Sequence, residues 1–210
     1  MKQLYPDLWQ TTAEHPFPGL TTHAYLYLRR GGNVLFYGSG RPDDHQRIRG
    51  FGGIVRQYLS HRDEAGPALA SIREMFGSML CCHRLEHTAV SKACPVDLTF
   101  QSAETHLGNI GVIPTPGHTD GSTSFLVTSP LGRRYLFTGD TIFPSNGAWG
   151  TFVMPDAGGS QADLMNSLEL LGQLEPDVVI SSASVGQMAF KKMAPGEWRE
   201  VIRDTVRSLP

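Results

Sequence analysis

Short apolar runs separated by turn residues dominate the pattern of this 210-residue chain. The runs are mostly β-branched or aromatic and are bounded largely by Gly, Pro or Ser, which is typical of β-strands. The predicted strands are Ala24 to Leu28, Val34 to Tyr37, Ile54 to Leu59, Ile110 to Pro114, Thr123 to Thr128, Tyr135 to Thr138 and Val178 to Ser181. Turn residues at Gly31-Gly32 and at Pro130-Leu131-Gly132 predict two hairpins.

Helical patterns lie between these strands. The clearest one begins behind Ser160, with Asp163 three residues on, an arrangement similar to a capping box, and it ends before Pro176. Its apolar face, at i, i+4 and i+7, is formed by Leu164, Leu168 and Leu171. The other expected helices are Asp44 to Phe51, Pro67 to Phe76 and Pro195 to Ser208. This alternation predicts an α/β fold, and periodicity alone allows several layered arrangements.

Composition fits one globular domain over residues 1–210, because 40% of the residues are hydrophobic and 18% are charged. A formal net charge of -2 supplies no basic field, so we expect no nucleic-acid partner. The first residues lack the apolar core of a secretory signal, and no stretch has the length of a membrane span. We therefore expect a cytoplasmic protein that does not bind membranes; the sequence does not indicate its oligomeric state.

The three cysteines do not indicate a site. Cys81 and Cys82 are adjacent and Cys94 stands alone, so neither a disulfide framework nor a thiolate zinc site is expected. Adjacent cysteines in an apolar run are typical of a strand, in which one faces each side of the sheet.

Two glycine-containing turns carry the candidate chemistry. Pro-Thr-Pro-Gly-His-Thr-Asp-Gly-Ser spans Pro114 to Ser122, and Gly-Asp-Thr-Ile-Phe spans Gly139 to Phe143. Each turn follows a predicted strand and presents one donor, His118 or Asp140, as metal ligands are often placed. There are simpler alternatives: His118 could hydrogen-bond to the backbone of its own loop, and Asp140 could cap the loop that follows it. The co-occurrence of the two turns favours metal ligation.

Together these turns resemble the metallo-β-lactamase fold superfamily, whose members carry TPGHTxGS and GDxxF turns in this order and at this spacing. The resemblance covers roughly residues 20 to 186, and the hydroxyacylglutathione-hydrolase-like branch is the nearest in size. It implies a four-layer αββα sandwich, in which two mixed β-sheets are flanked by helices.

The chain departs from the superfamily's first metal motif, HxHxDHxG, in the segment from Leu59 to Gly66. The first histidine of the motif is Leu59 here and the third is Glu64, whereas His61 and Asp63 remain. The superfamily's last histidine would fall near Ser182 to Gly186, yet no histidine follows His118. Two simpler interpretations stay open. This segment could be a solvated approach to a helix, or Arg62 could neutralise the two carboxylates beside it.

The resemblance implies that His61, His118 and Asp140 hold one divalent metal. Zinc is the favoured metal, and iron and manganese are alternatives. A further alternative is that the site holds no metal. Asp63, Glu64 and the shared Asp140 would form a second, oxygen-only site that suits a harder ion and is expected to be weak or empty. The implied activity is hydrolysis of a small ester, thioester or lactone by metal-activated water. Asp63 would orient this water or accept its proton.

Two other functions remain as alternatives. A non-catalytic protein with a decayed site could bind a ligand or partner through the same fold, and a mononuclear iron oxidoreductase could use the two histidines and one carboxylate. Substrate specificity would come from loops such as Phe143 to Ala157, where Trp149 and Phe152 either line a pocket or pack on the sheet. His23 is either a pocket residue or a surface strand histidine.

Overall fold

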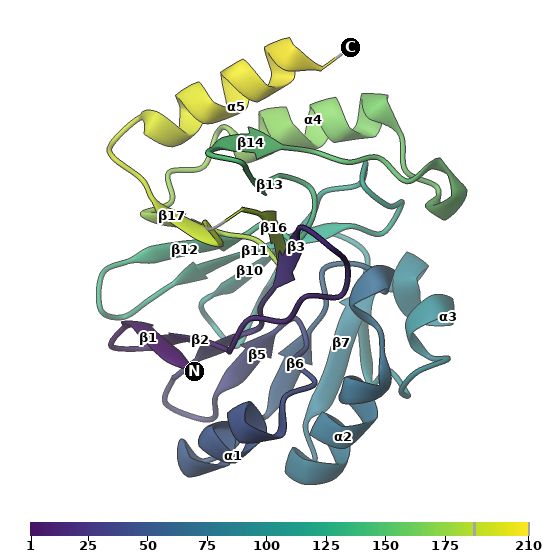
Figure 1. The fold of residues 1–210 in the computed structure, drawn as a ribbon, viewed down its shortest axis with the longest axis vertical. Coiled ribbons are helices and arrows are strands. Elements are labelled where there is room, and N and C mark those ends of the chain that lie inside the picture. Colours follow the sequence, from purple (N-terminus) through teal and green to yellow (C-terminus); the bar gives the residue numbers. More distant parts are fainter. Residues whose placement is uncertain (187, 210) are drawn as a thin grey trace.

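The computed structural model describes residues 1–186 and 188–209, and in this range it arranges three sheets between two layers of helices (Figure 1). The seven-stranded sheet has the order β1 (Lys2–Tyr5), β2 (Leu8–Gln10), β4 (Tyr25–Tyr27), β5 (Val34–Phe36), β6 (Arg56–Tyr58), β7 (Met79–His83), β8 (Leu98–Phe100). The six-stranded sheet has the order β17 (Phe190–Lys192), β15 (Val178–Ile180), β12 (Arg134–Phe137), β11 (Thr123–Thr128), β10 (Ile110–Pro114), β9 (Glu104–His106). A smaller sheet has the order β14 (Ala148–Gly150), β13 (Phe143–Ser145), β16 (Ala183–Val185), β3 (Leu20–Thr22).

Helices cover the outer faces of the sheets. On the side of the seven-stranded sheet lie α1 (Pro42–Gly50), α2 (Pro67–Phe76) and α3 (His87–Val90), and on the opposite side lie α4 (Gln161–Leu171) and α5 (Glu197–Ser208) (Figure 1). Short 3-10 helices are η1 (Arg62–Glu64), η2 (Arg84–Glu86) and η3 (Pro155–Ala157). Both large sheets are mixed, with parallel pairs from β5 to β8 and between β12 and β15. The expected αββα sandwich is therefore confirmed.

An aromatic core fills the space between the two large sheets. Phe36 of β5 stacks on Phe137 of β12 with 4.0 Å between ring centroids. The ring centroid of Phe125 of β11 lies 5.4 Å from that of Phe36. All three side chains are fully buried. Because these rings come from both sheets, their packing joins one half of the sandwich to the other.

Alternate residues of the same strands face the outer helices. Leu136 and Val179 pack with the apolar faces of α4 and α5, where the Trp198 indole donates to the Leu171 carbonyl at 2.8 Å. On the other side, Cys82 packs in the cluster under α2 and α3, whereas Cys81 faces the inner core. The sequence-based expectation that the two cysteines face opposite sides of a strand is confirmed.

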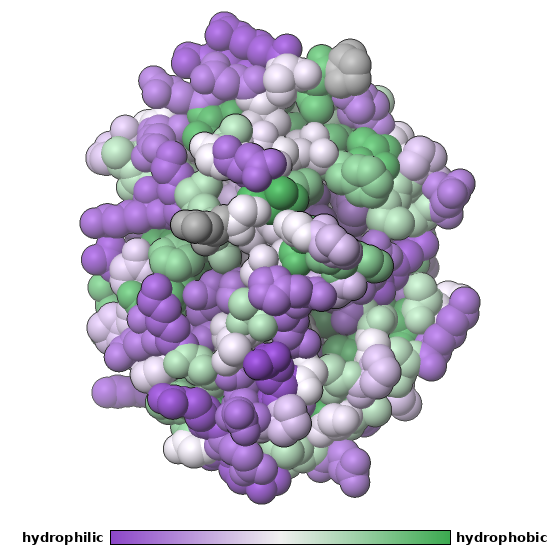
Figure 2. Space-filling model, in the orientation of Figure 1, coloured by the Kyte–Doolittle hydropathy of each residue, from purple (hydrophilic) through white to green (hydrophobic). Residues whose placement is uncertain are grey.

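The surface is mostly polar. Figure 2 shows hydrophilic residues over much of one face, including the region of α5. Within the described residues, every helix is too short or too polar to cross a lipid bilayer.

The predicted elements appear with boundaries that differ by a few residues. α2 has the predicted bounds, and Ser160 caps α4 by accepting from the Asp163 backbone N–H at 3.1 Å. Both predicted hairpins are present as antiparallel pairs, β4 with β5 and β11 with β12. The strands that the hydrophobic pattern did not predict are mostly short edge or small-sheet strands, including all four of the smaller sheet.

We predict that Phe36→Ala lowers the free energy of unfolding by about 3–5 kcal/mol, because it removes a fully buried ring from the contact between the sheets. Urea denaturation followed by circular dichroism measures the change. Phe17→Ala is the matched control, since this ring is 67% exposed. Equal losses in the two variants would contradict the assignment of the inter-sheet core.

Candidate metal centre

Three loops from the two large sheets meet at one edge of the sandwich. His61 follows β6, His118 follows β10 and Asp140 follows β12. The backbone N–H of Thr123, at the start of β11, donates to the Ser60 carbonyl at 2.9 Å and links the two sheets beside the site. The donors predicted from separate motifs therefore lie on loops that the fold brings together.

Two glycines allow these loops to approach closely. Gly139 has φ +53°, and a Cβ atom there would overlap the side chain of Ser60. Gly117 has φ +141°, and a Cβ atom there would overlap the backbone of Leu164 in α4. Any other residue would strain the backbone and push its loop away. The turn glycines thus set the positions of Asp140 and His118.

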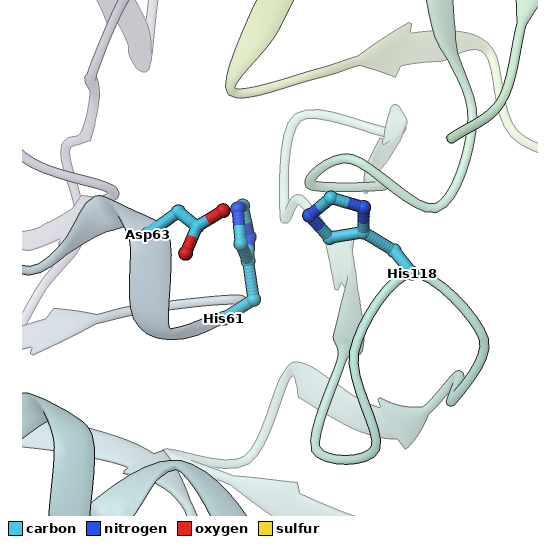
Figure 3. Close-up of side chains that lie close together, drawn as sticks. All are labelled: His61, Asp63 and His118. Atoms are coloured by element: carbon cyan, nitrogen blue, oxygen red, sulfur yellow. The ribbon is translucent and has the colours of Figure 1, made fainter. Parts of the chain in front are cut away.

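The two imidazole rings face each other across the site (Figure 3). Their centroids lie 4.6 Å apart and their planes are nearly perpendicular, at 87°. One nitrogen of each ring and a carboxylate oxygen of Asp63 lie within 4.8 Å of one another. Both histidines are buried, whereas Asp63 is exposed.

His118 has a defined tautomer. Its Nδ1 lies 2.8 Å from the Phe152 carbonyl oxygen, and because a carbonyl only accepts, Nδ1 carries the proton. Nε2 therefore presents a lone pair, and this buried atom has no hydrogen-bond partner among the described residues. Burial, followed by the nearby His61 ring, lowers the pKa of His118, which favours the neutral imidazole that ligates metals.

His61 is surrounded by acceptors. Its Nδ1 lies 2.9 Å from Ser60 Oγ and 3.4 Å from Glu64 Oε1, and its Nε2 lies 3.7 Å from Asp140 Oδ2. Burial lowers the pKa of this ring, but the charges of Glu64 and Asp140 outweigh that effect and raise it to about 9. Without a metal, the His61 ring is thus a cationic imidazolium at neutral pH, with a proton on each nitrogen. A metal ion would have to displace the proton on the nitrogen that it binds.

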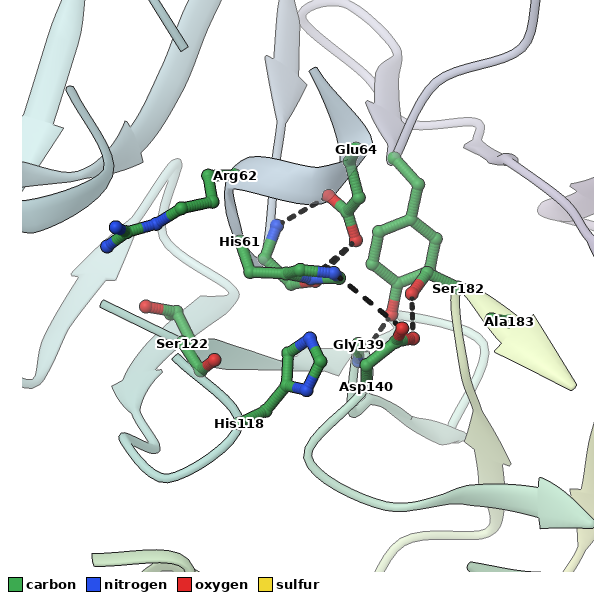
Figure 4. A network of polar contacts seen from close by, with 12 residues as sticks. His61, Arg62, Glu64, His118, Ser122, Gly139, Asp140, Ser182 and Ala183 are labelled. Carbon is green, nitrogen blue, oxygen red and sulfur yellow. Dashed lines mark hydrogen bonds and ion pairs between the residues drawn. The ribbon is translucent and has the colours of Figure 1, made fainter. Parts of the chain in front are cut away.

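Glu64 binds its own loop. One carboxylate oxygen accepts from the Ser60 backbone N–H at 2.8 Å, and the other accepts from the Ser60 hydroxyl (Figure 4). Because the hydroxyl donates to Glu64, it is free to accept from His61 Nδ1, which leaves His61 Nε2 to face the site. Glu64 was expected to point inward as a ligand or, in a decayed site, to turn to solvent or pair with Arg62. In the structure Glu64 lines the cavity, and both of its oxygens bind Ser60, which orients Ser60 and His61. Its part in a second metal site stays a prediction.

Asp140 is held by Ser182. The Ser182 hydroxyl donates to Asp140 Oδ1 at 2.6 Å, which leaves Oδ2 directed toward His61 (Figure 4). Ser182 lies in the segment where the resemblance places a last histidine. The serine there orients a carboxylate, a role that no histidine motif indicates.

Arg62 pairs with residues outside its own segment. Its guanidinium binds Glu86 and Asp120, and in the described part of the chain it makes no ion pair with Asp63 or Glu64. The proposed neutralisation of those two carboxylates by Arg62 is therefore wrong. Glu86 is fully buried and also accepts from the Thr119 hydroxyl at 2.6 Å. No sequence motif marked Glu86, although it ties the loop of His61 to the loop of His118.

These donors fit one divalent ion. The two buried imidazoles and the Asp63 carboxylate lie within 4.8 Å of one another and form a ligand set that suits zinc and, equally, iron(II). Asp140 is not in this group of three, although its Oδ2 lies 3.7 Å from His61 Nε2. The unpartnered Nε2 of His118 is the atom that a bound ion would satisfy. The donors for a second ion are weaker, because both oxygens of Glu64 are engaged by Ser60.

A cavity of about 640 Å³ opens beside the site and includes His61, Asp63 and Asp140 in its wall. His23 also lines it, with Nδ1 bonded to the Thr11 carbonyl at 2.9 Å, so it is a pocket residue. Trp149 instead packs on Trp198 of α5, with 5.6 Å between ring centroids. Phe152 is 58% exposed and contributes its carbonyl to His118.

Comparison with known proteins supports the fold. The sequence profile of the metallo-beta-lactamase superfamily matches residues 37–183. A B3 metallo-beta-lactamase described as the first with an active-site glutamic acid superposes with a TM-score of 0.70 at 17% identity, covering 98% of this chain and 87% of the other. TTHA1623 in a di-iron-bound form superposes with a TM-score of 0.66 at 22% sequence identity, and the match covers 86% of this chain and 93% of the other. A Cronobacter sakazakii metallo-beta-lactamase with a HARLDQ motif superposes with a TM-score of 0.62 at 17% sequence identity. This match covers 82% of this chain and 78% of the other. No curated protein sequence matches this chain.

We predict that Arg62→Met lowers the free energy of unfolding of the metal-free protein by about 3 kcal/mol, because it leaves the buried Glu86 carboxylate without its cation. Chemical denaturation measures the loss. Arg199→Met is the control, since Arg199 and Glu175 form an exposed pair at 3.8 Å and should contribute little. A similar small effect in both variants would show that Arg62 does not hold the two loops together.

We also predict that Glu64→Ala weakens metal binding by about tenfold or more, because Ser60 and His61 lose their orientation. Glu64→Gln should restore most of the affinity, since its amide oxygen can still accept from the Ser60 backbone. Competition with a chromophoric chelator measures both variants. If Glu64 were itself a ligand, Gln would bind metal as poorly as Ala.

Proposed function

Because this chain belongs to the metallo-beta-lactamase superfamily, we propose that it is a metal-dependent hydrolase of a small ester, thioester or lactone. The observation that carries the proposal is the buried, unpartnered Nε2 of His118, which faces the His61 ring and the exposed Asp63 carboxylate. A purely structural histidine at this depth would be expected to bond through both nitrogens.

The proposed ligands are His61, His118 and Asp140. Each is held by a neighbour that leaves one donor atom facing the site: Ser60 for His61, the Phe152 carbonyl for His118 and Ser182 for Asp140. A divalent ion bound there, with zinc favoured, would lower the pKa of a bound water and polarise the substrate carbonyl. Three protein ligands leave a position open for that water, as in other hydrolytic sites.

Asp63 is proposed to orient the water and accept its proton. It lies on the same loop as His61, belongs to the same cluster and lines the cavity. Because its side chain is exposed, it can pass a proton to solvent after accepting it. Asp140 is proposed as the carboxylate ligand because Ser182 restrains it, although Asp63 is the carboxylate that lies within 4.8 Å of both histidines.

The test combines metal analysis with an assay of zinc-loaded protein on aryl ester, thioester and lactone substrates. His118→Ala should lose most of the bound metal and the activity with it. Asp63→Asn should keep the metal and lose about 10²-fold or more in kcat, because it removes a proton acceptor and not a ligand. His87→Ala is the control, since this exposed histidine lies in α3 and belongs to no ligand cluster among the described residues.

Each outcome assigns the site. Stoichiometric zinc and ester cleavage support the hydrolase. Bound iron with no hydrolysis would favour the oxidoreductase, because two histidines and one carboxylate also suit iron(II). Protein that takes up no metal would favour a binding role for the cavity. If Asp63→Asn lost the metal and Asp140→Asn kept it, Asp63 would be the ligand and Asp140 the group that accepts the proton.

A further inference from the structure

The cavity beside the candidate metal centre is strongly acidic. Four carboxylates line it, and no Lys or Arg does so among the described residues. The four are Glu14, Asp63, Glu64 and Asp140. A bound divalent ion would balance two of these negative charges and leave the wall acidic.

Positive groups near the cavity are directed elsewhere or are weaker. His61 lines the cavity, but as a metal ligand it would be a neutral imidazole. Arg62 is bound by Glu86 and Asp120 and does not line the cavity. Its side chain points away from Glu64 and Asp140 (Figure 4). The N-terminal end of α2 does line it through Pro67 and Ala68, but a helix terminus supplies only about half a positive charge. Burial, the first of several effects, lowers the pKa of His23, so this ring adds no charge at neutral pH. The carboxylates therefore dominate the potential.

Glu14 is the carboxylate that the proposed metal chemistry does not use. It lies on the segment that leads to β3, where its backbone pairs with Thr22 through bonds of 3.0 and 2.9 Å. One side-chain oxygen accepts from the Gly40 N–H at 3.0 Å, which fixes the half-buried carboxylate in the wall. It is thus a preorganised negative group away from the ligand loops.

An apolar surface adjoins Glu14 on the same segment. Pro16, Phe17 and Leu20 all line the cavity, and the Phe17 ring is 67% exposed. An exposed aromatic ring next to a fixed carboxylate suits a ligand that has an apolar chain and a cationic end, because a ring face also attracts cations.

We propose that this cavity selects substrates in which an apolar chain ends in a cationic group such as an ammonium, and that it discriminates against substrates bearing a carboxylate. The inference rests on the hydrolase function proposed above and specifies the substrate class of the same site. Glu14 is the specificity-determining residue, and Phe17 supplies the apolar contact. Anionic thioesters such as those of glutathione are disfavoured substrates.

The test uses three matched thioesters whose six-carbon acyl chains end in an ammonium, a methyl or a carboxylate group. Zinc-loaded protein should give the highest kcat/KM for the ammonium substrate and the lowest for the carboxylate substrate. The corresponding amides, which report binding without turnover, are titrated by calorimetry. We expect the ammonium amide to bind about tenfold more tightly than the carboxylate amide, with a ratio that falls as salt is added.

Glu14→Gln should lower the ammonium-to-carboxylate ratio by about fivefold in both measurements, which corresponds to one partly screened charge pair. Glu175→Gln is the matched control, because this glutamate is 77% exposed and lies outside the cavity. The control should leave the ratio unchanged. An equal shift in both variants would show a nonspecific effect of net charge and overturn the role of Glu14.

The two proposals fail separately. If no thioester is cleaved but the amides keep the predicted order, the hydrolase function is wrong and the charge selectivity stands. If all three thioesters are cleaved with equal kcat/KM, or the carboxylate substrate is preferred, the hydrolase function stands and the substrate class is wrong.

Discussion

The site depends on the contacts that the buried Glu86 carboxylate makes with two loops. This carboxylate binds Arg62, from the loop after β6, and the Thr119 hydroxyl, from the loop after β10. These loops belong to different sheets and carry the two histidines, so one charged group ties together the loops of His61 and His118. A Cβ atom at Gly121 would overlap the Glu86 side chain, which explains why the turn has glycine there. A fully buried charge is stabilising only with such partners.

Local pattern predicted most of the central strands and the long helices because these elements have strong periodicity, whereas the αββα arrangement of the layers was implied by the family resemblance. The central strands have short apolar stretches, such as Phe125 to Val127 in β11, and α4 combines a cap with an apolar face. The small sheet lacked such a signal. β16 and β3 are three residues each and pair across about 160 residues of chain. Such pairing depends on tertiary contacts, which no short segment encodes.

The candidate donors were predictable where a turn imposes a sequence constraint. His118 and Asp140 follow glycines that close contacts require, so the motif reflects geometry. The groups that orient the donors are Ser60, Ser182 and the Phe152 carbonyl. A serine or a backbone carbonyl carries no distinctive pattern, and Glu86 is 25 residues from His61 along the chain. Their roles arise only when the two sheets pack together.

The electrostatics of the site connect metal binding to the cavity. Glu64 and Asp140 hold a proton on His61 when no metal is present, so the cluster balances its negative charge either with protons or with a divalent ion. Raising the pH removes the competing proton and favours the ion. Glu14 lies outside this exchange, because its carboxylate is bonded to Gly40 and not to the ligand loops. In the proposed function, the ligand cluster would change its charge on binding metal while the cavity wall around Glu14 stays acidic. This separation would let one cavity hold a divalent ion and still select a cationic substrate.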